Sequence, residues 1–149
     1  MKTFFKNFMI FCVGFASYQT IEGFWKVFIT HEPQSFTMGL IGGVLFLLIG
    51  LLNNGFSWEL PIWLQSIIGG AVITIIEFIS GLVINKWLCP LMNRPLIWDY
   101  TGIPGNILGV VCPQYFFAWV FLATLCILID DYLRYIVYDD KKPKYKFWF

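Results

Sequence analysis

The chain has 149 residues, of which 58% are hydrophobic, 20% are aromatic and only 13% are charged. A soluble domain carries about 25% charged residues, so this chain has too few polar side chains to cover a soluble globule. The composition therefore predicts an integral membrane protein, and the length allows one compact bundle without a second domain. The net charge of +1 excludes a polybasic surface, so we expect no nucleic-acid partner.

Charged residues separate four apolar segments, each long enough for the roughly 20 helical residues that cross a bilayer. We expect spans at about 4–29, 36–53, 60–84 and 105–129, and an interfacial tail over 130–149. The runs lack the alternation of a β-barrel, so the predicted fold is an all-α four-transmembrane-helix bundle forming a single domain, residues 1–149. A basic start before an apolar run also occurs in signal peptides, but the apolar pattern continues past Ala16, which favours a retained first span.

The distribution of Lys and Arg predicts the orientation of this bundle. With four spans both termini lie on one side, and that side carries seven basic residues: Lys2, Lys6, Arg134, Lys141, Lys142, Lys144 and Lys146. The opposite side carries three: Lys26, Lys86 and Arg94. Because cytoplasmic loops are enriched in Lys and Arg, we expect both termini in the cytoplasm and the protein in the cell membrane.

The first span carries an acid that has two interpretations. Tyr18 and Glu22 share one helix face, and Lys26 follows Glu22 at a spacing of four residues. This order is the favourable one for a helical ion pair. Glu22 is therefore either the interfacial partner of Lys26 or a member of a polar site.

In the second span, small and polar residues fall on one helical face: Gly39, Gly43, Phe46, Gly50 and Asn53. Small residues let helix backbones approach closely in lipid. We interpret this face as a packing surface, either inside the bundle or between copies of the chain.

The third span has a similar face, and this one contains an acid: Ser66, Gly70, Thr74, Glu77 and Gly81. Isoleucines occupy the opposite side, so we expect Glu77 to point toward protein or a cavity. A carboxyl group at membrane depth is costly unless it is paired or protonated. Glu77 is thus either a group that binds a substrate, cation or proton, or a structural acid that clamps helices.

The fourth span is expected to begin near Gly105, with Asn106 as its N-cap and Pro113 as a kink about two turns in. After this span, Asp130 and Arg134 stand four residues apart. We expect a short amphipathic C-terminal helix at the interface, followed by a basic and aromatic tail on the lipid headgroups.

Several chemical signatures do not occur in the sequence. It has no nucleotide-binding loop of the G-x-x-x-x-G-K-[ST] type, and no nucleophile–base pair stands out. His31 is the single histidine, and the four cysteines form no C-x-x-C pair, so no metal site is indicated. We expect no enzyme activity, no metal and no cofactor.

Three stretches of the sequence together resemble a known family. They are YQTIEGFW (18–25), IIEFISGLVIN (75–85) and WDYTGIPGNILGVV (98–111). Their order resembles the integral membrane family of type IV ABC-transporter permeases, and the matching positions are Tyr18, Glu22, Glu77, Phe78, Gly81, Trp98, Asp99, Tyr100, Asn106 and Gly109. Thr101 stands where the family usually has Ser, and Ile21 replaces part of its glycine–tryptophan step. The resemblance implies one polar constellation containing Glu22, Glu77, Asp99 and Asn106.

Two functional hypotheses follow. In the first, the chain is a small permease or binding component with an outward-facing acidic pocket: Glu22, Glu77, Asp99, Tyr100 and Asn106, with Tyr18 and Trp98. This pocket would bind a polar or cationic small molecule or a lipid headgroup. In the second, the chain is a structural or interaction protein that acts as a homo-oligomer or with a separate partner subunit. Asp99 could form an Asx turn, but we expect it to point inward.

Overall fold

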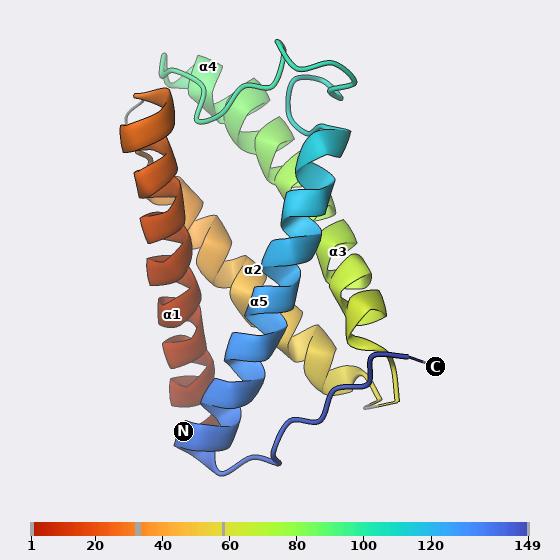
Figure 1. The fold of residues 1–149 in the computed structure, drawn as a ribbon. Coiled ribbons are helices and arrows are strands. Elements are labelled where there is room, and N and C mark those ends of the chain that lie inside the picture. The colour runs from red at the N-terminus through yellow and green to blue at the C-terminus, as the bar shows by residue number, and fades with distance from the viewer. Residues whose placement is uncertain (1, 32–33, 58, 149) are drawn as a thin grey trace. The chain divides into compact units, whose positions relative to one another are not determined.

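The computed structural model describes residues 2–31, 34–57 and 59–148, with side chains for all of these except 2 and 30. Figure 1 shows the helices that these residues form: α1 (Lys2–Phe24), the π-helical turn η1 (Trp25–Thr30), α2 (Phe36–Gly55), α3 (Ile62–Val83), the π-helical turn η2 (Ile84–Leu88), α4 (Cys89–Leu91) and α5 (Pro113–Tyr138). Within the described ranges, extended pairing is limited to one bridge between Ile107 and Val111. The all-α prediction is therefore confirmed for this part of the chain.

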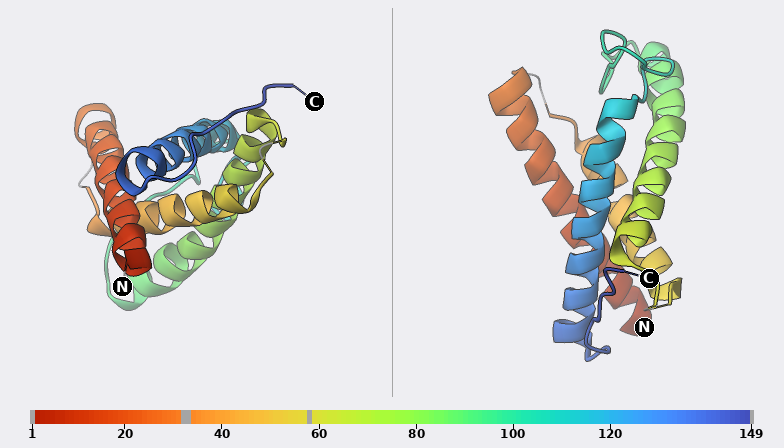
Figure 2. Two further views of the ribbon diagram at one scale, coloured as in Figure 1. Left: turned by 90° about the horizontal axis from the view of Figure 1, so that it is seen from below. Right: turned by 45° about the vertical axis from the view of Figure 1, so that its right-hand side comes forward.

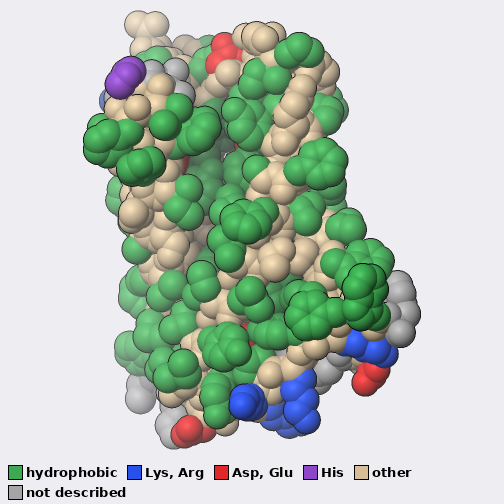
Figure 3. All heavy atoms as spheres, viewed as in Figure 1, with side chains coloured by type: hydrophobic (Ala, Val, Ile, Leu, Met, Phe, Trp, Pro, Cys, Tyr) green, Lys and Arg blue, Asp and Glu red, His purple; other side chains and the backbone are tan. Residues whose placement is uncertain are grey.

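Three of the described helical segments are long and apolar enough to cross a membrane: Phe36–Gly55, Ile62–Leu91 and Pro113–Tyr138. They correspond to the second, third and fourth predicted spans. α1 is not among them, and its second half contains the polar run Ser17–Thr20 followed by Glu22. In the space-filling view, hydrophobic side chains cover most of the visible flank (Figure 3). The four-span topology stays a prediction.

The chain divides into two compact units, residues 1–61 with 125–149 and residues 62–124. In the first unit, α1 and α2 form an antiparallel pair (Figure 1). Gly42 lies against Tyr18, and a Cβ atom placed on Gly42 would be 2.3 Å from the Tyr18 Cβ. Gly43 lies equally close to the Phe11 ring. The small-residue face of α2 therefore packs on α1, as the interpretation inside the bundle predicts.

In the second unit, the predicted polar face of α3 is buried, including Ser66, Gly70 and Glu77. The Thr124 hydroxyl of α5 donates to Ser66 Oγ (2.8 Å), and Val120 leaves no room for a Cβ on Gly70. The opposite face is exposed, as expected for isoleucines that contact lipid. Figure 2 shows the segment between α4 and α5 folded over the end of the continuous helical segment Ile62–Leu91, which consists of α3, η2 and α4.

The predicted start of the fourth span is wrong, because α5 begins at Pro113. The segment before it folds into turns in which Gly105 and Gly109 have φ angles of 77° and 68°, values that favour glycine and end a helix. Pro113 occupies the first helical position, where its missing N–H costs nothing. It is therefore a helix start and not a kink, and Asn106 is not the N-cap of this helix.

The separate amphipathic C-terminal helix is also not found. α5 continues without a break to Tyr138, because no glycine or proline interrupts 129–138. Asp130 and Arg134 are buried in the first unit instead of lying at a headgroup surface. The sequence period of an interfacial helix and that of a helix end packed in protein are the same, so the pattern did not separate them.

Candidate functional site

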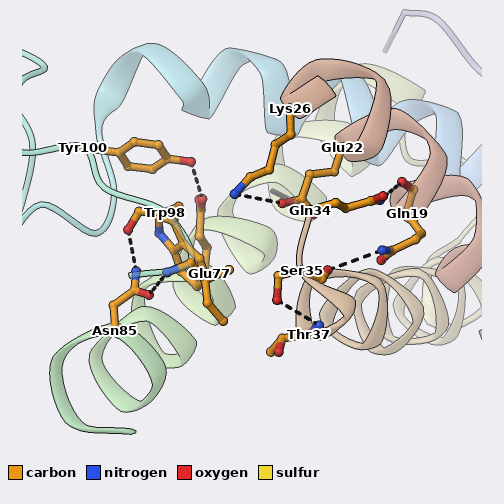
Figure 4. A network of polar contacts seen from close by, with 11 residues as sticks. Gln19, Glu22, Lys26, Gln34, Ser35, Thr37, Glu77, Asn85, Trp98 and Tyr100 are labelled. Atoms are coloured by element: carbon orange, nitrogen blue, oxygen red, sulfur yellow. Dashed lines mark hydrogen bonds and ion pairs between the residues drawn. The ribbon is translucent and has the colours of Figure 1, made fainter. Parts of the chain in front are cut away.

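The centre of the candidate site is the carboxyl group of Glu77 on α3, in the second unit. The Glu77 side chain is only 5% exposed. The Tyr100 hydroxyl donates to Glu77 Oε1 over 3.0 Å (Figure 4). Glu77 Oε2 is buried and has no hydrogen-bond partner among the described residues. A buried oxygen in this state costs free energy, so it either carries the proton or binds a partner other than the described residues.

Aromatic side chains surround this carboxyl group. Tyr100 stacks on Tyr115 of α5, with 4.8 Å between the ring centroids, and Tyr115 in turn lies against Trp119, 6.2 Å away. The Trp119 side chain also lies near the Glu77 carboxyl group. The site therefore combines one acid with three electron-rich rings. In the described structure, no Lys or Arg of the second unit forms an ion pair with this acid.

A buried amide holds the loop that carries Tyr100. Asn85 lies in η2, two turns after Glu77 on the same helix face. Its Nδ2 donates to the Trp98 carbonyl (2.7 Å), and its Oδ1 accepts from the Ile97 N–H (2.9 Å), as Figure 4 shows. Asn85 was not among the predicted site residues. The four-residue steps from Glu77 through Gly81 to Asn85 are the signal that could have revealed it.

Trp98 acts as a fixed element beneath the same loop. Its indole N–H donates to the Val110 carbonyl (2.9 Å), and the side chain is buried. Gly81 makes this packing possible, because a Cβ atom there would lie 2.1 Å from Val110 Cγ1 and 3.0 Å from the Trp98 ring. Trp98 therefore positions the loop and has no free donor for a ligand.

The structure does not bring Asp99 and Asn106 to the Glu77 carboxyl group. Asp99 is exposed, and its Oδ1 accepts from the Thr101 N–H (2.9 Å), which keeps the pKa of this carboxyl below its usual value. The expected inward direction of Asp99 is wrong, and the Asx turn is the arrangement found. Asn106 donates to the Ile103 carbonyl (2.8 Å) and accepts from the Gly109 N–H (2.8 Å). Its side chain therefore links two parts of the same loop.

Glu22 and Tyr18 belong to the first unit. Glu22 Oε1 lies 3.8 Å from Lys26 Nζ, which confirms the predicted ion pair (Figure 4). Both side chains are buried, and Glu22 Oε2 has no partner among the described residues. Tyr18 packs on Gly42 between α1 and α2. A pocket that joins these residues to Glu77 would combine the two units and stays a prediction.

The first unit contains a second buried polar cluster, formed by residues that the sequence analysis did not connect. Arg134 Nε donates to Asp130 Oδ2 (2.6 Å) one turn away on α5. Asp131 accepts from Asn53 Nδ2 of α2 (2.7 Å) and from the Tyr145 hydroxyl of the tail (3.0 Å). The Asp130–Arg134 pair was visible as an i,i+4 spacing. No local pattern links Asn53 to Asp131, which lies 78 residues later.

Neither cluster offers a metal-ligand set. Within the described ranges, no group of three or more His, Cys, Asp or Glu side chains lies close enough to hold a metal ion. The arrangement around Glu77 is instead suited to a ligand that supplies positive charge or hydrogen-bond donors, since a buried carboxyl oxygen and aromatic faces are acceptors.

Three apolar helices of membrane-crossing length, in a described chain that is helical apart from loops and one bridge, are typical of a helical membrane protein. Residues 16–146 match the model of the family described as "Putative ABC-transporter type IV", and the chain belongs to this family. This membership, together with the apolar helices, supports a membrane transport-related role. No curated protein and no solved structure matches the chain.

Proposed function

We propose that the chain is a non-catalytic, multi-pass component of a transport system that binds a cationic small molecule at Glu77. The observation that carries this proposal is the buried Glu77 carboxyl group, which has one oxygen held by Tyr100 and the other without a partner in the described structure. A buried acid that no Lys or Arg of its unit neutralises favours a ligand that brings the positive charge.

The neighbouring rings narrow the chemical class of this ligand. Tyr100, Tyr115 and Trp119 are stacked beside the carboxyl group. Cations, and quaternary ammonium groups above all, are attracted to the faces of such rings. We therefore propose an organic ammonium compound, because a small metal ion would need more oxygen ligands than this site contains.

The proposed topology has four spans in the cell membrane. α1 is the first span, and both termini lie in the cytoplasm. The excess of Lys and Arg near the termini supports this orientation. In a cysteine-free variant, a single cysteine replacing Lys142 should react with a membrane-impermeant maleimide only after the cells are opened. Labelling of intact cells would contradict the orientation without affecting the Glu77 site.

The binding proposal is tested with choline as the probe. The chain is reconstituted in lipid nanodiscs, and choline binding is measured by calorimetry with 3,3-dimethyl-1-butanol, its uncharged analogue, as the control ligand. We expect choline to bind and its analogue to bind at least ten times more weakly. Glu77→Gln, which keeps the shape of the side chain, should reduce choline affinity at least tenfold.

Glu59→Gln is the matched control, because Glu59 is an exposed acid of the first unit whose charge is lost in the same way. This variant should bind choline like the unsubstituted chain. Equal choline affinity in the Glu77→Gln variant, or equal affinity for the uncharged analogue, would contradict the proposal.

The second hypothesis, a structural protein that acts as an oligomer or with a partner subunit, can be tested at the small-residue face of α2. Buried glycines make helix contacts in both units. The space beside Gly39 is occupied by Gln19 and Phe15 of α1, and the space beside Gly43 by Phe11. These two glycines therefore serve contacts inside the chain. Gly39→Leu with Gly43→Leu should unfold the α1–α2 pair, whereas dissociation of a folded oligomer would favour the second hypothesis.

A further inference from the structure

The segment after α5 is fastened to the first unit at several points. Asp140 N–H donates to the Arg134 carbonyl (3.2 Å), and the Asp140 carboxylate pairs with Lys6 of α1. Further along, the Tyr145 hydroxyl donates to the buried Asp131, and Lys146 Nζ donates to Glu59 Oε2 (2.8 Å). The tail over residues 139–148 is thus held along its length and follows one course, as Figure 1 shows for the dark blue segment.

These contacts divide the lysines of this end into two groups. Lys6 and Lys146 are neutralised by acids of the same unit. Lys141, Lys142 and Lys144 are exposed, and none forms an ion pair with another described residue. Figure 3 shows Lys and Arg side chains gathered at this end of the molecule. The fold therefore satisfies some basic residues internally and leaves three adjacent ones pointing to solvent.

Exposed aromatic side chains continue the same surface. Phe147 is 63% exposed and Trp148 is 82% exposed, although both are large and apolar. Lysines followed by aromatic residues are typical of segments that lie on lipid headgroups, where the ammonium groups meet phosphate and the rings enter the interface. An acidic protein surface would use the lysines but would not require two unburied aromatic rings.

The position of the tail in the chain favours the same partner. α5 is one of the helices long and apolar enough to cross a membrane, and it ends at Tyr138, three residues before Lys141. The lysines therefore follow directly where the chain leaves the bilayer, within the roughly 10 Å over which an anionic surface attracts charge.

We propose that Lys141, Lys142 and Lys144, with Phe147 and Trp148, form a binding surface for anionic membrane lipids, the tail lipid surface. The Tyr145–Asp131 hydrogen bond and the Lys146–Glu59 ion pair hold this surface in place. This assignment is independent of the Glu77 site, so either can fail without the other.

The test uses the full chain, purified in a neutral detergent and titrated with fluorescent phosphatidylglycerol. Phosphatidylcholine, which has no net charge, is the competitor. We expect preferential binding of phosphatidylglycerol that weakens as salt rises, and no displacement by the same concentration of inorganic phosphate. Since a basic residue near an anionic surface contributes a factor of about five, replacing all three exposed lysines by Gln should weaken binding by roughly 100-fold.

Two variants control for charge and for placement. Lys86→Gln with Arg94→Gln removes as much charge as Lys141→Gln with Lys142→Gln, but from the second unit, and should leave phosphatidylglycerol affinity unchanged. Tyr145→Phe keeps every charge and the ring but removes the hydrogen bond to Asp131, and should weaken binding about two- to fivefold by loosening the tail.

Unchanged phosphatidylglycerol affinity in the triple lysine variant would overturn the proposal and leave an acidic protein as the partner of these lysines. An equal loss in the Lys86 and Arg94 variant would also overturn it, because net charge alone would then explain the binding. The substituted lysines and Arg94 are exposed, so the charge variants should fold, which an unchanged unfolding temperature in detergent would verify.

Discussion

Buried carboxyl groups occur in both units of the chain, around Glu77 in one and around Asp130 and Asp131 in the other. Asp130 has Arg134 one turn away, and Asp131 accepts hydrogen bonds at both oxygens. Glu77 has the Tyr100 hydroxyl at one oxygen and no partner in the described structure at the other. The first cluster thus contains a cation of its own, although Asp130 Oδ1 is also buried without a partner in the described structure. The Glu77 carboxyl group forms no ion pair with a described Lys or Arg, which leaves an acidic group for a ligand.

This difference has a physical consequence for the two roles. A buried ion pair resists the loss of either member, because the remaining charge stays without compensation. A buried acid held by one neutral donor contributes little to stability and keeps its capacity to bind. We therefore expect substitutions at the Asp130 cluster to change stability, and substitutions at Glu77 to change binding.

The largest expected effect is that of Arg134→Met, which leaves Asp130 buried without its cation. The free energy of unfolding in detergent micelles should fall by about 3–5 kcal/mol. Replacing Asp130 by Leu in the same chain should recover most of this loss, because no unpaired charge remains. A loss below about 1 kcal/mol for the single variant would show that the pair is not structural and would remove the contrast with Glu77.

Asn85→Ala tests whether the Glu77 site depends on its supporting loop. The substitution leaves the Trp98 carbonyl and the Ile97 N–H without their side-chain partner, so the free energy of unfolding should fall by about 2 kcal/mol. Choline affinity should fall as well, since Tyr100 belongs to this loop. Asn54→Ala is the control, because the Asn54 side chain donates only to the carbonyl of Gly50 on its own helix. Reduced stability with unchanged choline affinity would separate the loop from the site.

Tyr100→Phe removes the donor to Glu77 but keeps the ring that stacks on Tyr115. The free energy of unfolding should change by about 1 kcal/mol or less, while choline affinity should fall about two- to fivefold. Tyr132→Phe, at an exposed tyrosine of the first unit, should change neither quantity. A stability loss as large as that of Arg134→Met would place Glu77 among the structural acids.

The smallest expected effect concerns Asp99 and pH. The Thr101 N–H lowers the pKa of Asp99 in the folded chain, so the turn is stabilised fully above the unfolded value of about 3.9. This contribution is lost as the pH falls through the lowered folded-state pKa. Asp99→Asn should therefore flatten the stability profile slightly below about pH 4.5 and leave choline binding at pH 7 unchanged. Loss of binding at pH 7 would return Asp99 to the site.

Much of the helix packing was predictable from residue spacing. The period of 3.6 residues placed Glu77 with Ser66, Gly70 and Gly81 on a face of α3 that the structure buries. The Glu22–Lys26 and Asp130–Arg134 pairs were equally visible, because an i,i+4 contact depends on the helix alone. These features are local, so they needed no knowledge of how distant segments meet.

The loop before α5 could not be predicted in the same way. An apolar run with one proline is compatible with a long kinked helix and with turns followed by a helix start. Asn106, which closes the loop on Gly109, and Asn85, which holds Ile97 from another helix, decide between them. These side-chain contacts, and the positive φ angles of Gly105 and Gly109, are features that periodicity does not encode.

The sequence by itself determined that this is a helical membrane protein, which helix faces carry small and polar residues, and that Glu77 lies on the polar face of an apolar helix. Those properties follow from composition and helical period, which act along the chain. Only the tertiary structure decided which hydrogen-bond partners from distant segments the buried acids receive. Asp131 meets Asn53 and Tyr145 from distant segments, while Glu77 meets Tyr100 and aromatic rings, because contacts between remote residues arise when the chain packs.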